Sequence, residues 1–199
     1  MQTAPDPARW GELALAQAPF GPIVDGAVLE LPPLEALRAG YGDDVPLLMG
    51  TNRDEASMFF VATGILDAID DTALTATASA YGLTGAQIAV YRNRRPGAGP
   101  GEVLSAVATD WFFGISAVRV AEIKRSADTW LYRFDDQEPS ANHTLGASGT
   151  ASRSRTFSAP SIGPRLIAVA AAMQDLWTSF IRGESPGWTP TPAPSAPRR

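Results

Sequence analysis

The chain has 199 residues, no cysteine, and a formal net charge of −5 from 16 basic and 21 acidic residues. This length suits about one domain with a buried core, and the missing cysteines exclude disulfides, thiolate metal sites and cysteine nucleophiles. An acidic balance without a basic stripe argues against a nucleic-acid partner, and no apolar run approaches the ~20 residues of a membrane span. The N-terminal residues lack the basic and apolar regions of a secretory signal, so the localisation stays open.

The first half is predicted to alternate short elements with turns. Residues 1–32 hold many prolines and are expected to be irregular, and a short helix over 33–39 should end at Gly40. Residues 45–50 (VPLLMG) are an apolar run typical of a buried strand. The polar loop 51–55 (TNRDE) follows, and an apolar patch over 58–60 comes next. Further predictions are helices over 71–81, 84–92 and 102–108, with an exposed linker over 94–101 (RRPGAGPG).

The second half contains the two clearest elements. Aromatic, β-prone residues predict a strand over 129–134 (TWLYRF), preceded by a helix over 115–124. Residues 166–182 repeat apolar side chains at helical spacing, and Gly183 follows the last of them. The Pro-rich tail 189–199 is expected to be disordered. Strands separated by helical segments favour an α/β fold class.

Isolated motifs identify no chemistry. The sequence has no G-x-S-x-G nucleophile elbow, no Gly-rich phosphate loop and no metal-spaced histidine cluster. His143, the single histidine, lies among Ser, Asn and Thr and reads as a surface residue. Asp54 and Glu55, taken alone, read as a solvated acidic turn. Aromatic residues 111–113 fit either an apolar acyl pocket or a core.

Several separate motifs nevertheless agree in order with one family. Between about Phe20 and Trp188 the sequence resembles the type B carboxylesterases, which include bacterial para-nitrobenzyl esterases and the cholinesterases. The resemblance implies the C-terminal portion of an α/β-hydrolase fold, a partial sheet with packing helices. A partial sheet is expected to expose an edge strand and an apolar face. The matching segments are 20–26 (FGPIVDG), 45–55 (VPLLMGTNRDE), Phe59, 109–122, 129–135 (TWLYRFD) and 172–180 (AMQDLWTSF).

The resemblance implies a Ser-Glu-His triad, in which a carboxylate orients the imidazole that activates the serine. Glu55 stands at the position of the family's triad carboxylate, and the carboxyl end of a strand suits that role. Asn52, Arg53 and Asp54 are expected to shape and charge the loop. The family needs no cofactor, and the substrate of the intact parent would be a small-molecule ester.

Two departures from the family are severe. Its members are more than twice as long, and the part before Phe20 carries the serine elbow and the oxyanion loop. The family's histidine follows the second strand at the position of Gly149, and His143 does not match it. Residues 1–188 are therefore expected to be a partial carboxylesterase domain that is inactive alone.

Residues 148–163 are either a divergent loop or a frame-shifted one. If the codons of 148–158 are read one base out of frame, they permit Gly-His-Gly-Ile-Glu-Ile-Pro-Tyr-Val-Phe, which is the family's histidine segment. This reading requires serine codons that begin TC and a GGC codon for Gly149. Two other readings remain: a non-catalytic, cholinesterase-like protein-binding module, and the product of a pseudogene.

Overall fold

The computed structural model describes residues 22–124, 127–135 and 164–191, and the chain divides into two compact units, 1–41 and 42–199. In the first unit, the described part forms an irregular segment and the short helix α3 (Pro33–Arg38). The helix begins with proline at its first turn, and Gly40 follows it with a φ of 93°. This left-handed conformation favours glycine and ends the helix where the sequence predicts.

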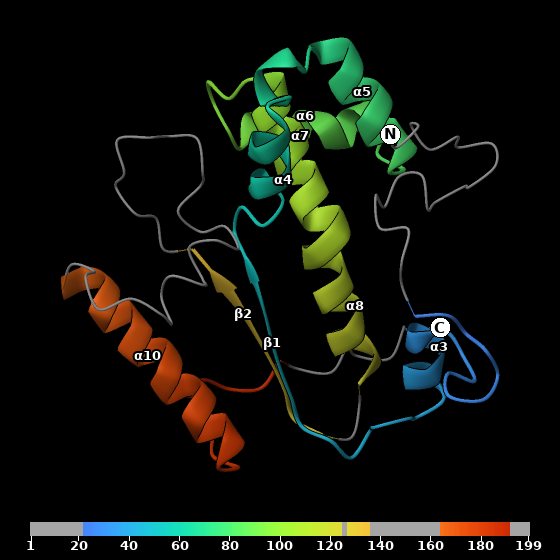
Figure 1. Cartoon of the computed structure of the whole chain (residues 1–199), viewed down its shortest axis with the longest axis vertical. Helices are drawn as coiled ribbons and strands as arrows, with labels where there is room; N and C mark the ends of the chain where they lie inside the picture. Colours follow the sequence, from blue (N-terminus) through green and yellow to red (C-terminus); the bar gives the residue numbers. More distant parts are fainter. Residues whose placement is uncertain (1–21, 125–126, 136–163, 192–199) are drawn as a thin grey trace. The chain divides into compact units, whose positions relative to one another are not determined.

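The second unit contains a parallel pair of strands, β1 (Leu47–Asn52) and β2 (Thr129–Phe134) (Figure 1). Their register pairs Leu47 with Thr129 and Asn52 with Phe134. The predicted strand 45–50 is shifted by two residues. Pro46 has no N–H to donate, and the first cross-strand bond near this end runs from Leu47 N to Asp128 O at 2.9 Å. The strand predicted over 129–134 is confirmed.

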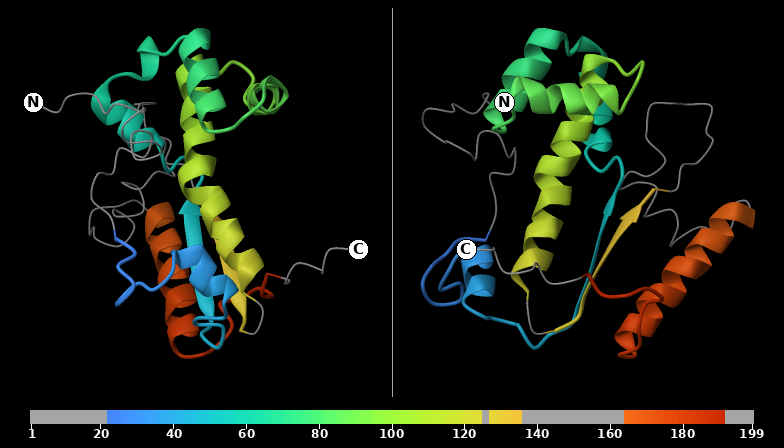
Figure 2. Two further views of the ribbon diagram at one scale, coloured as in Figure 1. Left: turned by 90° about the vertical axis from the view of Figure 1, so that its right-hand side faces the viewer. Right: turned by 180° about the vertical axis from the view of Figure 1, so that it is seen from behind.

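The strands lie between two helices, α8 (Ile115–Ile123) and α10 (Pro164–Ile181), as Figures 1 and 2 show. On the α10 side, Trp130 meets Phe180 edge to face, with ring centroids 5.8 Å apart. Tyr132 meets Trp177 in the same way at 6.4 Å. These aromatic pairs fix α10 against β2, and such geometry adds to simple area burial.

The chain after α10 returns to β2. Gly183 follows the helix with a φ of 79°, as expected for a glycine after a helix end. The carbonyl of Trp188 accepts from Trp130 Nε1 at 3.0 Å, and Thr191 N donates to Thr129 O at 2.7 Å. Only 189–191 of the predicted disordered tail lie within the described residues.

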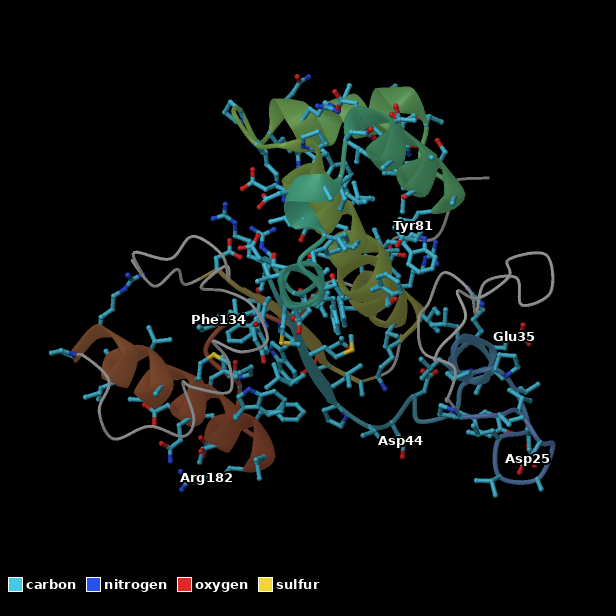
Figure 3. The ribbon with its side chains drawn as sticks, turned by 45° about the horizontal axis from the view of Figure 1, so that its top comes forward. Asp25, Glu35, Asp44, Tyr81, Phe134 and Arg182 are labelled. Atoms are coloured by element: carbon cyan, nitrogen blue, oxygen red, sulfur yellow. The ribbon has the colours of Figure 1, made fainter. Side chains whose placement is uncertain are left out.

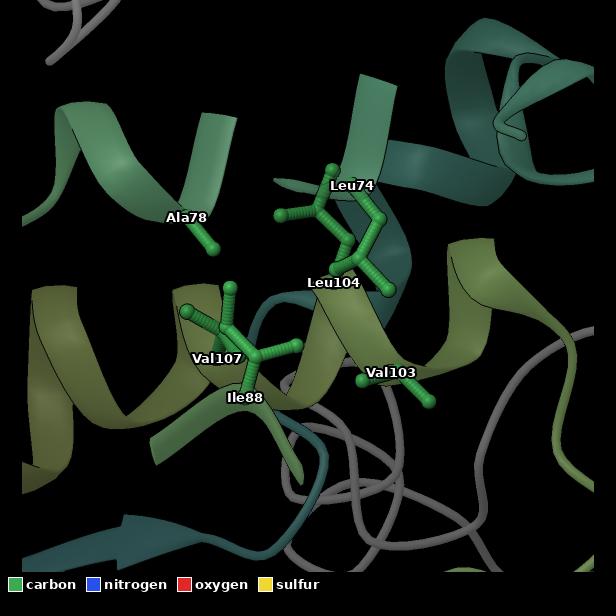
Figure 4. Close-up of a cluster of buried hydrophobic side chains, with 6 residues drawn as sticks. All are labelled: Leu74, Ala78, Ile88, Val103, Leu104 and Val107. Atoms are coloured by element: carbon green, nitrogen blue, oxygen red, sulfur yellow. The ribbon is translucent and has the colours of Figure 1, made fainter. Parts of the chain in front are cut away.

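A helical cluster makes up the rest of the described second unit. Its main core lies between α5, α6 and α7. Figure 4 shows the buried aliphatic side chains that form it, Leu74, Ala78, Ile88, Val103, Leu104 and Val107. Asp70 caps α5 by accepting from Ala73 N at 2.8 Å, and Thr84 with Gln87 forms a capping box on α6. The elements are α4 (Ser57–Thr63), η1 (Leu66–Ala68), α5 (Asp71–Ala80), α6 (Gly85–Asn93) and α7 (Pro100–Thr109).

The long helix of the molecule joins α7 to α8 through a π-helical turn, η2 (Asp110–Gly114). The sequence predicts the two helices separately and places 94–101 in an exposed linker. That prediction is wrong at its end, because α7 begins at Pro100 and Gly101 is buried. A Cβ at Gly101 would overlap the carbonyl oxygen of Leu66, so glycine allows the two backbones to approach. Helix α4 is also new, because its apolar run carries no clear period.

Aromatic residues at the π-helical turn pack on the end of α5. Tyr81, labelled in Figure 3, stacks on Trp111 with ring centroids 4.6 Å apart, and Phe112 meets Trp111 edge to face. The sequence left open whether residues 111–113 line an acyl pocket or pack in a core. Trp111 and Phe112 pack within the helical cluster.

The 24-residue stretch Pro100–Ile123 is long and apolar enough to cross a bilayer, and it is the one such helix in the described ranges. Its first half is almost wholly buried in the helical cluster. Burial of that kind is what a core helix shows, and length with composition is weak support for a span. The sequence-based prediction of no membrane span stays a prediction.

Candidate functional site

The loop that follows β1 carries the candidate catalytic residue. Arg53 N donates to Phe134 O at 3.0 Å and continues the pairing of the strands beyond Asn52. Ser57 N then donates to Asp54 O at 3.1 Å, and α4 begins at once. The chain therefore makes a tight turn at the carboxyl end of the sheet, held at both sides by backbone hydrogen bonds.

Glu55 lies inside this turn and is only 4% exposed. Its Oε2 accepts a hydrogen bond from Asn52 N at 2.7 Å. A bond from a backbone N–H to a carboxylate is charge-assisted, so it restrains the side chain as well as the loop. The burial contradicts the simple interpretation of Glu55 as part of a solvated acidic turn. Asp54 keeps more contact with solvent and lies 4.0 Å from the Arg53 guanidinium.

The turn is also fastened to the long helix. Ala56 N donates to Thr109 Oγ1 at 3.0 Å, and the same hydroxyl donates to Ser105 O at 2.9 Å. The hydroxyls of Ser57 and Ser105 lie 3.2 Å apart. Residues about fifty positions apart thus hold Glu55 in place. Small residues at regular spacing on α7 are the only sequence signal of this contact.

Asn52 contributes its backbone to the site, and its side chain raises a separate question. The residue is 1% exposed, and neither its Oδ1 nor its Nδ2 has a hydrogen-bond partner in the described part of the chain. A buried amide without a partner costs about 1–3 kcal/mol of stability. Any hydrogen-bond partner of this amide therefore lies outside the described residues.

The carboxyl end of β2 adds an ion pair at the same edge of the sheet. Arg133 Nε and Nη2 donate to the two carboxylate oxygens of Asp135 at 2.6 and 2.7 Å. The hydrogen bonds from Arg133 hold the pKa of Asp135 below its usual value, and the same bonds raise the pKa of Arg133. Because β1 and β2 are parallel, the loops that follow them lie at the same edge of the sheet, which is the position expected for a triad acid.

Neither the single histidine of the chain nor the position of the family's histidine can be compared with Glu55. His143 and Gly149, the position of the family's histidine, lie outside the described residues. Within the described ranges, no group of three or more His, Asp or Glu side chains could hold a metal ion. The geometry therefore presents one buried, oriented carboxylate at the carboxyl edge of a parallel sheet.

Comparisons with known proteins bear on the fold. The carboxylesterase family matches residues 9–195 of the chain. The carboxylesterase EST55 of Geobacillus stearothermophilus, solved at pH 6.2, superposes with a TM-score of 0.69 and 25% identity. The match covers 91% of this chain and 41% of that one. The same enzyme at pH 6.8 gives a TM-score of 0.65 and 26% identity, covering 88% and 38%. The chain thus spans about two fifths of these relatives, and the expected fold, the C-terminal portion of an α/β-hydrolase, is confirmed.

Proposed function

Because this chain belongs to the carboxylesterase family, we propose that it supplies the acid of a Ser-Glu-His triad to a serine carboxylic-ester hydrolase. Glu55 is that acid. The observation that carries the proposal is the buried Glu55 carboxylate, held by Asn52 N at 2.7 Å where the parallel strand β1 ends. The substrate of the complete enzyme is a small-molecule ester.

The role of Glu55 follows from the chemistry of the triad. Its carboxylate accepts a hydrogen bond from the N–H of one imidazole nitrogen, which fixes the tautomer and leaves the other nitrogen to take the serine proton. The negative charge then stabilises the imidazolium that forms. Hydrogen bonds from Asn52 N to Glu55, and from Ala56 N to Thr109, hold the carboxylate still during this transfer. Pre-organisation of this kind avoids reorientation at the moment of reaction.

The chain as it stands should not hydrolyse esters by this mechanism. Its sequence contains no G-x-S-x-G elbow, and Gly149 occupies the position of the family's histidine. A chromogenic short-chain ester assay on the purified chain tests this statement. We expect no turnover above a Glu55→Ala control. Turnover that depends on Glu55 would show that the chain is active alone.

The gene offers the test of the role of Glu55 itself. DNA upstream of the first codon should encode a G-x-S-x-G elbow, in frame or out of frame, and codons 148–158 should restore the histidine segment after a one-base shift. A corrected full-length enzyme should hydrolyse short-chain esters. In that enzyme Glu55→Ala should lower kcat by about 10⁴-fold, because the imidazole loses its orienting group.

Asp54→Ala is the matched control, since Asp54 precedes Glu55 in the same loop and is more exposed. We expect it to keep most of the activity. Equal losses in the two variants would reduce Glu55 to a structural residue. Upstream DNA without any elbow would remove the proposed parent enzyme.

A further inference from the structure

A second site lies at the carboxyl ends of the two strands, on the side of the sheet that α8 covers. It is a cavity of about 720 Å³ between α6, the turn η2 with α8, and the carboxyl ends of both strands. This volume falls within the range of about 300–1,000 Å³ that is usual for small-molecule sites. Asn52, Arg53 and Thr109 of the Glu55 loop contacts also line it, but the proposed triad assigns no role to its arginines.

The polar wall of the cavity is rich in arginine. Four arginines and two aspartates are among its lining residues, which leaves a formal excess of two positive charges in a chain whose net charge is negative. Low-dielectric walls focus such a field inside a cavity and raise the local concentration of anions. The lining charges are Arg53, Arg94, Arg95, Arg133, Asp110 and Asp135.

The two carboxylates already have partners. Asp110 Oδ2 accepts from the Tyr91 hydroxyl at 2.6 Å, and Asp135 takes both hydrogen bonds of the Arg133 fork. Burial and the Asp110 carboxylate raise the pKa of Tyr91, so its hydroxyl stays neutral and adds no negative charge. Among the described residues, neither Asp110 nor Asp135 forms an ion pair with Arg94 or Arg95.

Arg94 and Arg95 are the available cations of the cavity. Within the described residues, neither lies within salt-bridge distance of a carboxylate. The guanidinium of Arg95 lies over the Tyr91 ring, 5.8 Å from its centroid, which places that side chain at the cavity wall. Arg94 and Arg95, which are neighbours at the end of α6, thus both line the cavity.

Much of the remaining wall is apolar, although Thr51, Asn52 and Thr109 also line it. Its apolar lining residues come from α6, α8 and β2 and include Val90, Val118 and Leu131. An inorganic anion alone would leave this surface in contact with water. A ligand with both an anionic group and an apolar body would use both walls at once.

We propose that this cavity binds a small organic oxyanion with an apolar body, such as an aromatic carboxylate, through Arg94 and Arg95. Guanidinium forks match carboxylate and phosphate oxygens in a bidentate manner, so the charge alone does not separate these ligands. The apolar wall favours the organic carboxylate. The inference does not depend on the triad role of Glu55.

Calorimetric titration of the full chain at low salt tests the site with three probes. Benzoate should bind saturably. Benzamide, which has nearly the same shape but no charge, should bind at least about tenfold more weakly. Inorganic phosphate should bind more weakly than benzoate, because it cannot contact the apolar wall. Equal binding of benzoate and benzamide, or tighter binding of phosphate, would overturn the proposal.

Variants locate the binding. The double variant Arg94→Gln with Arg95→Gln should weaken benzoate binding by about tenfold or more. Arg119→Gln is the matched control, since Arg119 is an exposed arginine of α8 that does not line the cavity. Its benzoate affinity should equal that of the parent chain. The three substituted arginines are exposed or half-buried. The circular dichroism spectra of the parent chain, the double variant and the control variant should therefore be the same. Unchanged benzoate affinity in the double variant would overturn the proposal.

Discussion

The helical cluster and the sheet region differ in how far each completes its own packing. In the cluster, Leu74, Val103 and Val107 are at most 1% exposed. Beside the sheet, the α8 residues Ile115 and Val118 remain 45% and 43% exposed. Strand β1 pairs only with β2 within the described ranges, and the buried Asn52 amide has no partner there. One region closes its core, and in the other the apolar face of α8 stays open, where Ile115 and Val118 line the arginine cavity.

The long helix makes this difference especially clear, because it belongs to both regions. Its α7 half is buried in the cluster, and its α8 half carries the exposed apolar residues. The sequence predicts Ile115, Val118 and Val120 with Ala121 on one apolar side, yet of these only Ala121 is buried. An apolar stripe predicts that a partner surface exists somewhere, and it does not say whether this chain supplies that surface.

The largest test uses one residue type at two places on that helix. Val107→Ala should lower the free energy of unfolding by about 2–3 kcal/mol, because it opens a cavity in the closed core. Val118→Ala should change it by less than about 0.5 kcal/mol, since alanine's helix propensity offsets the small loss of packing. Chemical denaturation measures both. Similar losses in the two variants would remove the contrast between the regions.

Two glycines probe the cluster more finely. Gly101→Ala should cost about 1–3 kcal/mol, because the added Cβ overlaps the Leu66 carbonyl oxygen and the backbones must separate. Gly85→Ala, at the start of α6, meets nothing within 4 Å and should be neutral or stabilising. Thermal unfolding of the pair gives the answer. A harmless Gly101→Ala would mean that α7 and η1 are not in close contact.

In the sheet region, a substitution at Asn52 is expected to increase stability rather than reduce it. Asn52→Val should raise the free energy of unfolding by about 1 kcal/mol, because it removes a buried amide without a partner and places a β-branched residue in a strand. Asn93→Val, at the exposed end of α6, should bring no gain. Urea denaturation compares the two. A loss of stability in Asn52→Val would show that residues outside the described ranges hydrogen-bond this amide.

The smallest expected effect concerns the exposed pair of Arg133 and Asp135. The pKa of Asp135 is lowered by Arg133, so the pair contributes stability above the unfolded-state value of about 3.9 and loses it as the pH falls through the lowered folded value. Asp135→Asn should therefore cost less than about 1 kcal/mol at pH 7, and less still as the pH falls through the lowered folded value. Unfolding curves across this range check the sign. A difference that grows on acidification would contradict the assignment.

Much of the secondary structure could be predicted from local sequence. Strand 129–134 is confirmed, and the helices centred on Leu74, Ile88 and Met173 are confirmed within two residues. The helices rest on hydrogen bonds between near neighbours, such as the capping box of Thr84 and Gln87, whereas the strand was identified by its β-prone residues although it pairs with the distant β1. Helix α4 and the junction at η2 were not predicted, because the neighbours that stabilise them lie far along the chain.

The candidate site divides in the same way. The sequence placed Glu55 after a strand, and its likeness to the family singled out that residue among several acidic ones. Only the tertiary structure buried the carboxylate, because Thr109 and Phe134 hold the loop from positions more than fifty residues away. The arginine cavity also arises only there, where α6, α8 and the strand ends meet. Local patterns specify which element forms, and distant contacts decide what is buried, paired or left open.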